Sequence, residues 1–391
     1  MFNIFLTTQD IVHLFDNQKF NSFYMSGKLV SIFKQIEDNR RDLSKLHELN
    51  DILVMAIIAV ICGADTWNNI QEYCEAKKEW LSKFLSLENG IPSHDTFNRV
   101  ISSIDSEHFE RCFIEWVSEL IKITDVKEIV NIDGKTIRGA KQHGKKSPIH
   151  MVSAWAHNNN LVLGQVKVNE KSNEITAIPT LLEVLSVENS IVTIDAMGCQ
   201  TAIAEKIIEK QADYVLAVKN NQEQLFENIT DEFRFSKKVE IFEDTDLGHG
   251  RIETRKCSVI THFEHIENQE KWRNLQSIIR IESIREFKNS VKPKEEAVRY
   301  YISSLKISAK EFQHIICSHW SIENKLHWTL DVAFLEDQSR KRDTNAAQNF
   351  SVLTKIALNL LKNEKTAKVG VKGKRLKAGW DNQYLEKLIN L

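Results

Sequence analysis

The feature that most constrains the fold is a change of hydrophobic period at Val126, where helical spacing gives way to short β-branched runs. From there the pattern predicts three strands, a helix, a strand, a helix and a strand. We expect strands at 126–133, 149–156, 161–168, 191–195 and 214–218, with helices at 175–185 and 200–210. Three consecutive strands form an antiparallel meander, and a right-handed crossover returns the fourth strand parallel to the first. The order therefore predicts an α/β domain built on a mixed five-stranded sheet.

Two of these strands end in an aspartate. The first run closes with Asp133 and the fourth with Asp195. A single aspartate after a strand is most often a turn or capping residue. In this topology, however, the two strands are adjacent and parallel. Both carboxylates are therefore expected at one edge of the sheet, where open α/β sheets bind ligands.

A third carboxylate, Glu323, lies in the segment 318–328, which is typical of a single helix. On a helical period Glu323 shares a face with His319, Trp320 and His327. A packed aromatic cluster with a solvated glutamate is the alternative for this segment alone. The histidines are eight residues apart, unlike the i, i+4 pair of zinc proteases. Three carboxylates favour Mg²⁺ or Mn²⁺ over zinc, because hard cations prefer oxygen ligands.

Two such ions about 4 Å apart can activate a hydroxyl nucleophile and stabilise the leaving oxygen of a phosphodiester. Cationic and amide side chains gather in the sequence near the three acids. Singly, each favours a solvated surface group, but together they favour binding of a DNA backbone. The candidate DNA contacts are Lys135, Arg138, Lys145, Lys146, Lys219, Asn220, Gln222, His249, Arg251, Arg255, His319, Trp320, Asn324 and Lys325.

Periodicity also divides the rest of the chain. Residues 1–24 are weakly patterned, and Met25 is an alternative to Met1 as the start. Residues 25–124 show helical spacing and predict an all-helical N-terminal domain. The catalytic domain is expected to comprise 125–224 and 305–362, interrupted by a β-rich insertion at 225–304. Residues 363–391 are basic and are expected to form a C-terminal tail.

Composition excludes several classes of protein. The net charge of −2 gives no global signal for nucleic-acid binding, so charge must be considered locally. The six cysteines show no CxxC pair, which fits a reducing cytoplasm and argues against a disulfide scaffold. The longest apolar run, Ile52–Cys62, is too short to cross a membrane, which needs about 20 residues. We expect it to be a buried helix.

Four segments resemble motifs of bacterial DDE transposases. They are IDGKTIRG at 132–139, TIDAMG at 193–198, HGRIETR at 249–255 and HWSIENKLHW at 319–328. The segments CGAD at 62–65, GIPSHDTF at 90–97 and LDVAFLED at 330–337 are similar to the same family. The resemblance covers roughly residues 28–362 in order, and it is closest to the ISAs-type insertion-sequence branch that includes the H-repeat-associated proteins.

The resemblance implies a ribonuclease-H-like catalytic core in which Asp133, Asp195 and Glu323 form the catalytic triad and hold two divalent ions. It implies cleavage and strand transfer of double-stranded DNA at the ends of an insertion sequence, with a homodimer expected in the synaptic complex. Such a protein would work in the cytoplasm, associated with the nucleoid when DNA-bound. One position departs from the family pattern, because Cys317 stands where such helices usually carry an arginine.

Three alternatives remain open from the sequence. The chain could be a catalytically decayed, transposase-derived DNA-binding protein, with Cys317 as a sign of decay. It could be a cellular nuclease of the same fold that cuts without joining. It could also be a metal-free interaction protein. The sequence of the terminal repeats, the target site and the use of a hairpin intermediate do not follow from these residues.

Overall fold

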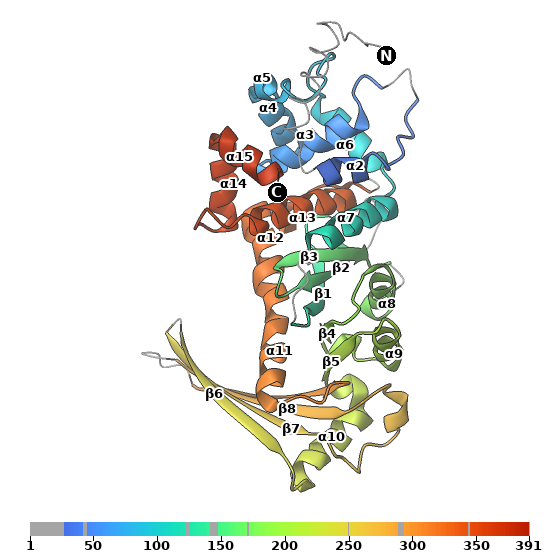
Figure 1. The fold of residues 1–391 in the computed structure, drawn as a ribbon, viewed down its shortest axis with the longest axis vertical. Coiled ribbons are helices and arrows are strands. Elements are labelled where there is room, and N and C mark those ends of the chain that lie inside the picture. The colour runs from blue at the N-terminus through green and yellow to red at the C-terminus, as the bar shows by residue number, and fades with distance from the viewer. Residues whose placement is uncertain are drawn as a thin grey trace, which may run out of the picture. The chain divides into compact units, whose positions relative to one another are not determined.

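The computed structural model describes residues 27–41, 45–121, 126–140, 148–169, 172–248, 250–287, 293–342 and 345–390 (Figure 1). Contacts divide the chain into two compact units. The first, here called the helical unit, comprises Met1–Leu120, Ile137–Ile149 and Thr329–Leu391. The second, here called the sheet unit, comprises Ile121–Thr136 and His150–Trp328. The expected extension at 1–24 lies outside the described residues.

The N-terminal part of the helical unit contains only helices among its described elements, in agreement with the helical spacing. The long apolar run forms α3, which is buried along nearly its whole length and packs against α13. The helices of this part are α2 (Gly27–Phe33), α3 (Leu49–Ile61), α4 (Trp67–Ala76), α5 (Lys78–Leu81), α6 (His94–Ser103) and α7 (Ser106–Leu120).

The C-terminal residues belong to this same unit, whereas the sequence pattern placed residues up to 362 in the catalytic domain. The reason is burial, because α13 (Ala346–Asn363) contacts α3, α6 and α7. Along the chain, α13 comes after α12 (Trp328–Phe334). The basic segment at 363–391, expected only as a tail, contains α14 (Val371–Trp380) and α15 (Asn382–Ile389). In the described part of the chain, no helix has the length and apolar composition needed to cross a bilayer.

The sheet unit contains the predicted meander and crossovers. Strand β2 pairs antiparallel with β3, while β4 pairs parallel with both β1 and β5. Helices α8 (Glu174–Val184) and α9 (Thr201–Glu209) make the two crossovers. The strands of this part are β1 (Ile129–Ile137), β2 (Ile149–Ala156), β3 (Leu161–Lys167), β4 (Ile191–Ile194) and β5 (Asp213–Val218).

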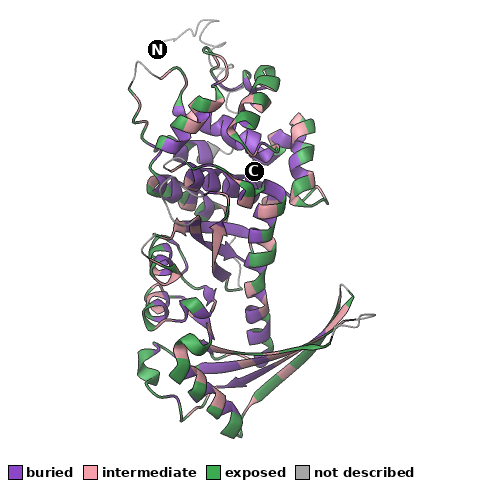
Figure 2. Cartoon of the chain, turned by 180° about the vertical axis from the view of Figure 1, so that it is seen from behind, coloured by how far each residue is buried: buried purple, intermediate pink, exposed green. Residues whose placement is uncertain are grey.

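The sheet has nine strands rather than the expected five, in the order β3-β2-β1-β4-β5-β9-β8-β7-β6. The β-rich insertion continues the same sheet, because β9 pairs antiparallel with β5 from Val215 opposite Ser303. Helix α10 (Glu223–Phe235) precedes these added strands. The added strands are β6 (Glu240–Gly248), β7 (Arg251–Ile260), β8 (Ser277–Phe287) and β9 (Glu295–Ser303). The outermost, β6, is mostly exposed and green in Figure 2.

Helix α11 (Ala309–Ser321) packs across one face of this extended sheet. Its start is fixed by a capping box, in which the Ser308 hydroxyl accepts from the Glu311 N–H and the Glu311 carboxylate accepts from Ser308. Phe312 and Ile316 of α11 pack in a buried cluster with residues of β7 and β8 such as Ile279. Figure 1 shows α11 rising from the added strands beside the central strands of the sheet. The helix thereby carries its C-terminal end toward β1 and β4.

Candidate metal centre and nucleic-acid interface

The two aspartates lie at neighbouring positions of adjacent strands. The parallel pairing of β1 with β4 ends at Ile132 opposite Ile194, and Asp133 and Asp195 are the next residues on each chain. The expectation that Asp133 ends its strand is wrong, because β1 runs on to Ile137. Strand β4 stops earlier, so Asp133 still lies where β1 loses its parallel neighbour. Both aspartates therefore lie at the same edge of the sheet, and the charge of Asp195 helps to raise the pKa of Asp133.

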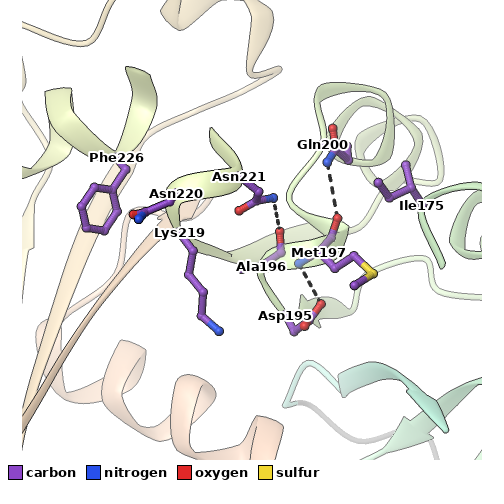
Figure 3. A pocket seen from close by; sticks show the side chains of 9 residues that line it. All are labelled: Ile175, Asp195, Ala196, Met197, Gln200, Lys219, Asn220, Asn221 and Phe226. Atoms are coloured by element: carbon purple, nitrogen blue, oxygen red, sulfur yellow. Dashed lines mark hydrogen bonds between the residues drawn. The ribbon is translucent and has the colours of Figure 1, made fainter. Parts of the chain in front are cut away.

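Asp195 is held by the turn that follows β4. Its Oδ1 accepts hydrogen bonds from the Met197 N–H at 3.1 Å and the Gly198 N–H at 3.4 Å. It lines a cavity of about 580 Å³ together with Lys219 (Figure 3). Burial raises the pKa of Asp195, and the charge of Glu174 adds to this rise while Lys219 opposes it. The aspartate is thus fixed in place yet open to a ligand.

Glu323 lies on a π-helical segment, Ile322–His327, that interrupts the helix expected at 318–328. The Trp328 N–H donates to the Glu323 carbonyl, five residues back. Single π-turns inside α-helices are frequent at functional sites, because the extra residue re-aims the side chains around it. Here the turn buries Leu326 and leaves Glu323 exposed. The sequence carries no signal for this turn.

His327 joins the carboxylates of Asp133 and Glu323. Its Nδ1 lies 3.1 Å from Glu323 Oε2 and 3.6 Å from Asp133 Oδ2. One ligand atom from each of the three residues lies within 4.8 Å of the others, close enough to share a metal ion. Because an ionised carboxylate can only accept, Nδ1 carries the proton in the contact with Glu323. His327 was absent from the candidates chosen by sequence, although it shares the helical face of Glu323.

The acids are costly to bring together without a cation. Burial, above all, raises the pKa of Asp133 to about 7. The charges of Asp195, Glu174 and Glu323 add to the rise, and only the Gly134 N–H opposes it. Desolvation and like charges both disfavour the ionised form of a carboxyl group. The charge of a bound divalent ion would favour the ionised carboxylates and offset both effects, so the donor set fits such an ion.

A chain of buried hydrogen bonds fixes the glutamate-bearing helix on the two aspartate strands. Asn131 Nδ2 donates to Thr193 Oγ1 at 2.8 Å, and Ser321 Oγ donates to Asn131 Oδ1 at 3.0 Å. The Thr193 hydroxyl lies 2.8 Å from His319 Nδ1. Burial lowers the pKa of His319 to about 4, so its imidazole is neutral and accepts from Thr193. This placement makes His319 an orienting group of the helix.

Three predicted donors follow β5 beside Asp195. Lys219 and Asn220 are exposed and line the same cavity as Asp195 (Figure 3). Gln222 is turned inward, since its Nε2 donates to the Cys199 carbonyl at 2.8 Å. Asn221 was not among the candidates, and it ties this loop to the Asp195 turn by donating to the Ala196 carbonyl.

A second group of candidates lines one groove of about 550 Å³, here called the arginine groove. It contains the predicted Arg251, Arg255, Trp320 and Asn324, together with Cys317. The sequence analysis missed two further cations here. They are Arg285 and Arg299.

One acid organises these cations. The Glu253 carboxylate contacts Arg255 at 2.8 Å, Arg285 at 3.3 Å and Arg251 at 3.7 Å. Although burial opposes it, the guanidinium groups of Arg255 and Arg285 hold the pKa of Glu253 below its ordinary value. Arg299 lies over the Trp320 ring, with Cζ 5.2 Å from its centroid. The groove therefore presents a fixed positive surface beside the Glu323 segment.

The other described cations among the candidates line neither of these two cavities. Lys325 donates to Asn160 at 3.0 Å, and Lys135 is half-buried on β1. Arg138 belongs to the helical unit, where its Nε lies 3.4 Å from Asp337. Three candidates lie outside the described residues, namely Lys145, Lys146 and His249.

Comparison with known families agrees with this geometry. A family model described as "Transposase DDE domain" matches residues 124–360, and one described as "DDE_Tnp_1-associated" matches residues 30–117. The chain belongs to the DDE transposase family. The first match covers the sheet unit with all three acids, and the second covers most of the N-terminal helices of the helical unit.

Individual DDE transposase relatives match nearly end to end. "Putative transposase YncI" of Escherichia coli O157:H7 is 46% identical over 92% of this chain and 94% of its own. "H repeat-associated putative transposase YhhI" of Escherichia coli strain K12 is 39% identical over 93% of this chain and 97% of its own. These names agree with the H-repeat branch indicated by the motifs.

One solved structure also aligns, a chain of the piggyBac transposase synaptic complex with hairpin DNA. It is 12% identical with a TM-score of 0.44, over 95% of this chain and 81% of that chain. This likeness is too weak to bear on function.

Proposed function

We propose that the chain is an active insertion-sequence transposase that cleaves double-stranded DNA at the element's ends and joins them to target DNA. Asp133, Asp195 and Glu323 are its catalytic triad. The observation that carries the proposal lies within the sheet unit, where Asp133 and Asp195 directly follow the last paired residues of β1 and β4, and Glu323 lies beside Asp133. The order β3-β2-β1-β4-β5 supports a ribonuclease-H-like core extended by four added strands.

Two Mg²⁺ or Mn²⁺ ions are the proposed cofactors. When bound, they would supply Lewis acidity that activates a hydroxyl nucleophile and stabilises the leaving oxygen of a phosphodiester. The three carboxylates would hold them, and the oxygen-rich donor set suits these hard cations. His327 donates to Glu323 and so orients its carboxylate, in the way that hydrogen-bonded partners orient ligands in metal sites.

The exposed cations beside the triad are the proposed DNA contacts. Lys219 lines the cavity of Asp195, where its ammonium group would hold a phosphate of the scissile strand. The arginine groove would bind the backbone farther along the duplex, since guanidinium groups match phosphate geometry. Cys317 lines this groove, so the cation missing at that position is one among several. The helical unit is the proposed reader of the terminal repeats, and a homodimer would pair two ends in the cytoplasm.

The retention of all three acids, with Asp133 and Asp195 at one sheet edge and Glu323 beside Asp133, favours activity over the decayed-protein alternative. A cellular nuclease would share the same centre, so the joining step separates the two. A metal-free interaction protein would have no need to gather raised-pKa carboxyl groups at a sheet edge, because their repulsion lowers stability.

The purified full chain is expected to nick DNA carrying the element's own ends in the presence of Mg²⁺, and to lose this activity with EDTA. Transfer of the freed 3′-hydroxyl to a second DNA is expected in the same reaction. The matched control is DNA of equal length without the terminal sequences, read on a denaturing gel. Nicking that ignores the terminal sequences and yields no joined product would point to a nuclease. No nicking by the wild-type protein on its own ends would contradict the proposed function.

A further inference from the structure

A further carboxylate, Glu174, lies against β1 at Gly134, the residue after Asp133. It lies in the first turn of α8, and only 16% of its side chain is exposed. Its Oε1 lies 2.7 Å from Nε2 of His150 on β2. Neither residue belongs to the motifs that carry the family resemblance.

The close approach of Glu174 depends on Gly134, the residue after Asp133. A Cβ at Gly134 would overlap Glu174 Oε1 and would lie 2.6 Å from His150 Nε2. The carboxylate therefore occupies the space that any other side chain would fill. This explains in physical terms why the aspartate is followed by a residue without a side chain.

His150 holds this carboxylate in a defined orientation. Thr136 Oγ1 lies 2.8 Å from His150 Nδ1, on the opposite side of the imidazole from Glu174. Since an ionised carboxylate only accepts, Nε2 donates to Glu174, and a neutral imidazole then accepts from the Thr136 hydroxyl at Nδ1. Such a chain fixes a carboxylate as outer partners fix ligands in metal sites.

The charge of Glu174 acts on both aspartates of the triad. It contributes to the raised pKa of Asp195, after burial, and to that of Asp133, after burial and Asp195. Three ionised carboxylates carry a charge of −3, whereas two divalent ions carry +4, so a fourth carboxylate balances the centre.

We propose that Glu174 is a fourth carboxylate of the metal centre. Its carboxylate occupies the space that Gly134 leaves open, and His150 holds it there by a hydrogen bond. The inference rests on the proposed function, because it assumes that divalent ions bind at the triad. It adds a residue of α8 to the acids supplied by β1, by the end of β4 and by the π-helical segment.

The test measures Mn²⁺ binding to the full chain without DNA. The electron paramagnetic resonance signal of free Mn²⁺ reports how much of the ion remains unbound. Glu174→Gln keeps an oxygen that accepts from His150 but loses the charge, so a purely structural role would leave binding unchanged. The proposal predicts binding weakened by about 10-fold or more. Glu183→Gln, on the exposed last turn of the same helix, is the matched control and should bind like wild type.

Two further variants keep the test decisive if Glu174→Gln fails to fold. Glu174→Asp retains the charge and should bind Mn²⁺ more tightly than Glu174→Gln. Gly134→Ala displaces the carboxylate without removing it, and should weaken binding as the glutamine does. If the folded Glu174 and Gly134 variants bind Mn²⁺ as tightly as the wild-type protein while Asp133→Asn abolishes binding, the role of Glu174 is wrong and the proposed function still stands. Absence of Mn²⁺ binding to the wild-type protein would instead overturn the proposed function.

Discussion

Replacing Asp133 by asparagine is expected to reduce Mg²⁺-dependent DNA cleavage by about 10³-fold or more. Loss of a ligand removes metal-ion stabilisation of the transition state worth several kcal/mol, and each 1.4 kcal/mol corresponds to a tenfold change in rate. The measurement is single-turnover nicking of element-end DNA. The matched control is Asp231→Asn, which changes an exposed aspartate on α10 and should cleave at the wild-type rate.

The same substitution is expected to stabilise the metal-free protein. The pKa of Asp133 is raised to about 7 in the folded chain, whereas an unfolded aspartate titrates near 3.9. Because the folded pKa is the higher one, the wild-type chain loses stability as pH rises from about 4 to about 7. Asparagine does not ionise, so Asp133→Asn should be more stable by roughly 4 kcal/mol at pH 8 and nearly equal at pH 4.

Thermal unfolding in EDTA at both pH values checks this second effect. Added Mn²⁺ should reverse the order at pH 8, since it stabilises only a protein that binds it. Equal melting temperatures at pH 8, together with unchanged cleavage, would contradict the assignment of Asp133 to the centre.

In the helical unit, the largest expected effect on stability is that of Arg375→Met. The Arg375 guanidinium is buried between α14 and the loop after α3. It donates to the Val60 carbonyl at 2.8 Å and to Asp65 Oδ1 at 2.7 Å, and it also donates to the Ala333 carbonyl. Methionine would leave the partly buried Asp65 carboxylate without its cation and would remove a donor from the Val60 and Ala333 carbonyls. Breaking a buried ion pair in this way costs about 3–5 kcal/mol.

Calorimetry should show a melting temperature lowered by roughly 10 °C for this unit. Arg99→Met, which alters an exposed arginine on α6, controls for the loss of charge and should shift the transition little. Adding Asp65→Asn to Arg375→Met should recover part of the loss, because the stranded charge is then removed. If the Arg375→Met and Arg99→Met proteins have the same melting temperature, the contacts of Arg375 do not stabilise the unit.

The central strands could be predicted because hydrophobic period and strand order leave few alternatives. Strands β2 and β3 lie close to the expected positions, and the parallel pairing of β1 with β4 brings Asp133 to Asp195. Strand β6 escaped prediction because its segment, EIFEDTDLG, is charged and mostly exposed, with no alternation to recognise. Its pairing with β7 stabilises it instead.

The parts of the site that escaped prediction depend on contacts between distant residues. The π-turn at Ile322–His327 is a backbone adjustment that composition does not encode. Glu174 lies far in sequence from every motif, and only folding brings it against Gly134. The arginines of the groove come from separate strands, so their convergence follows from sheet register. His327, in contrast, could have been predicted from the sequence, because it shares a helical face with Glu323.

The position of bound Mn²⁺ tests the account most directly. Crystals of the full chain soaked in Mn²⁺ should show anomalous difference density bounded by the carboxylates of Asp133, Asp195 and Glu323. Crystals of Asp133→Asn treated in the same way should lose that density. Wild-type crystals without density between these three carboxylates, or with Mn²⁺ bound only elsewhere on the chain, would contradict the proposed metal centre.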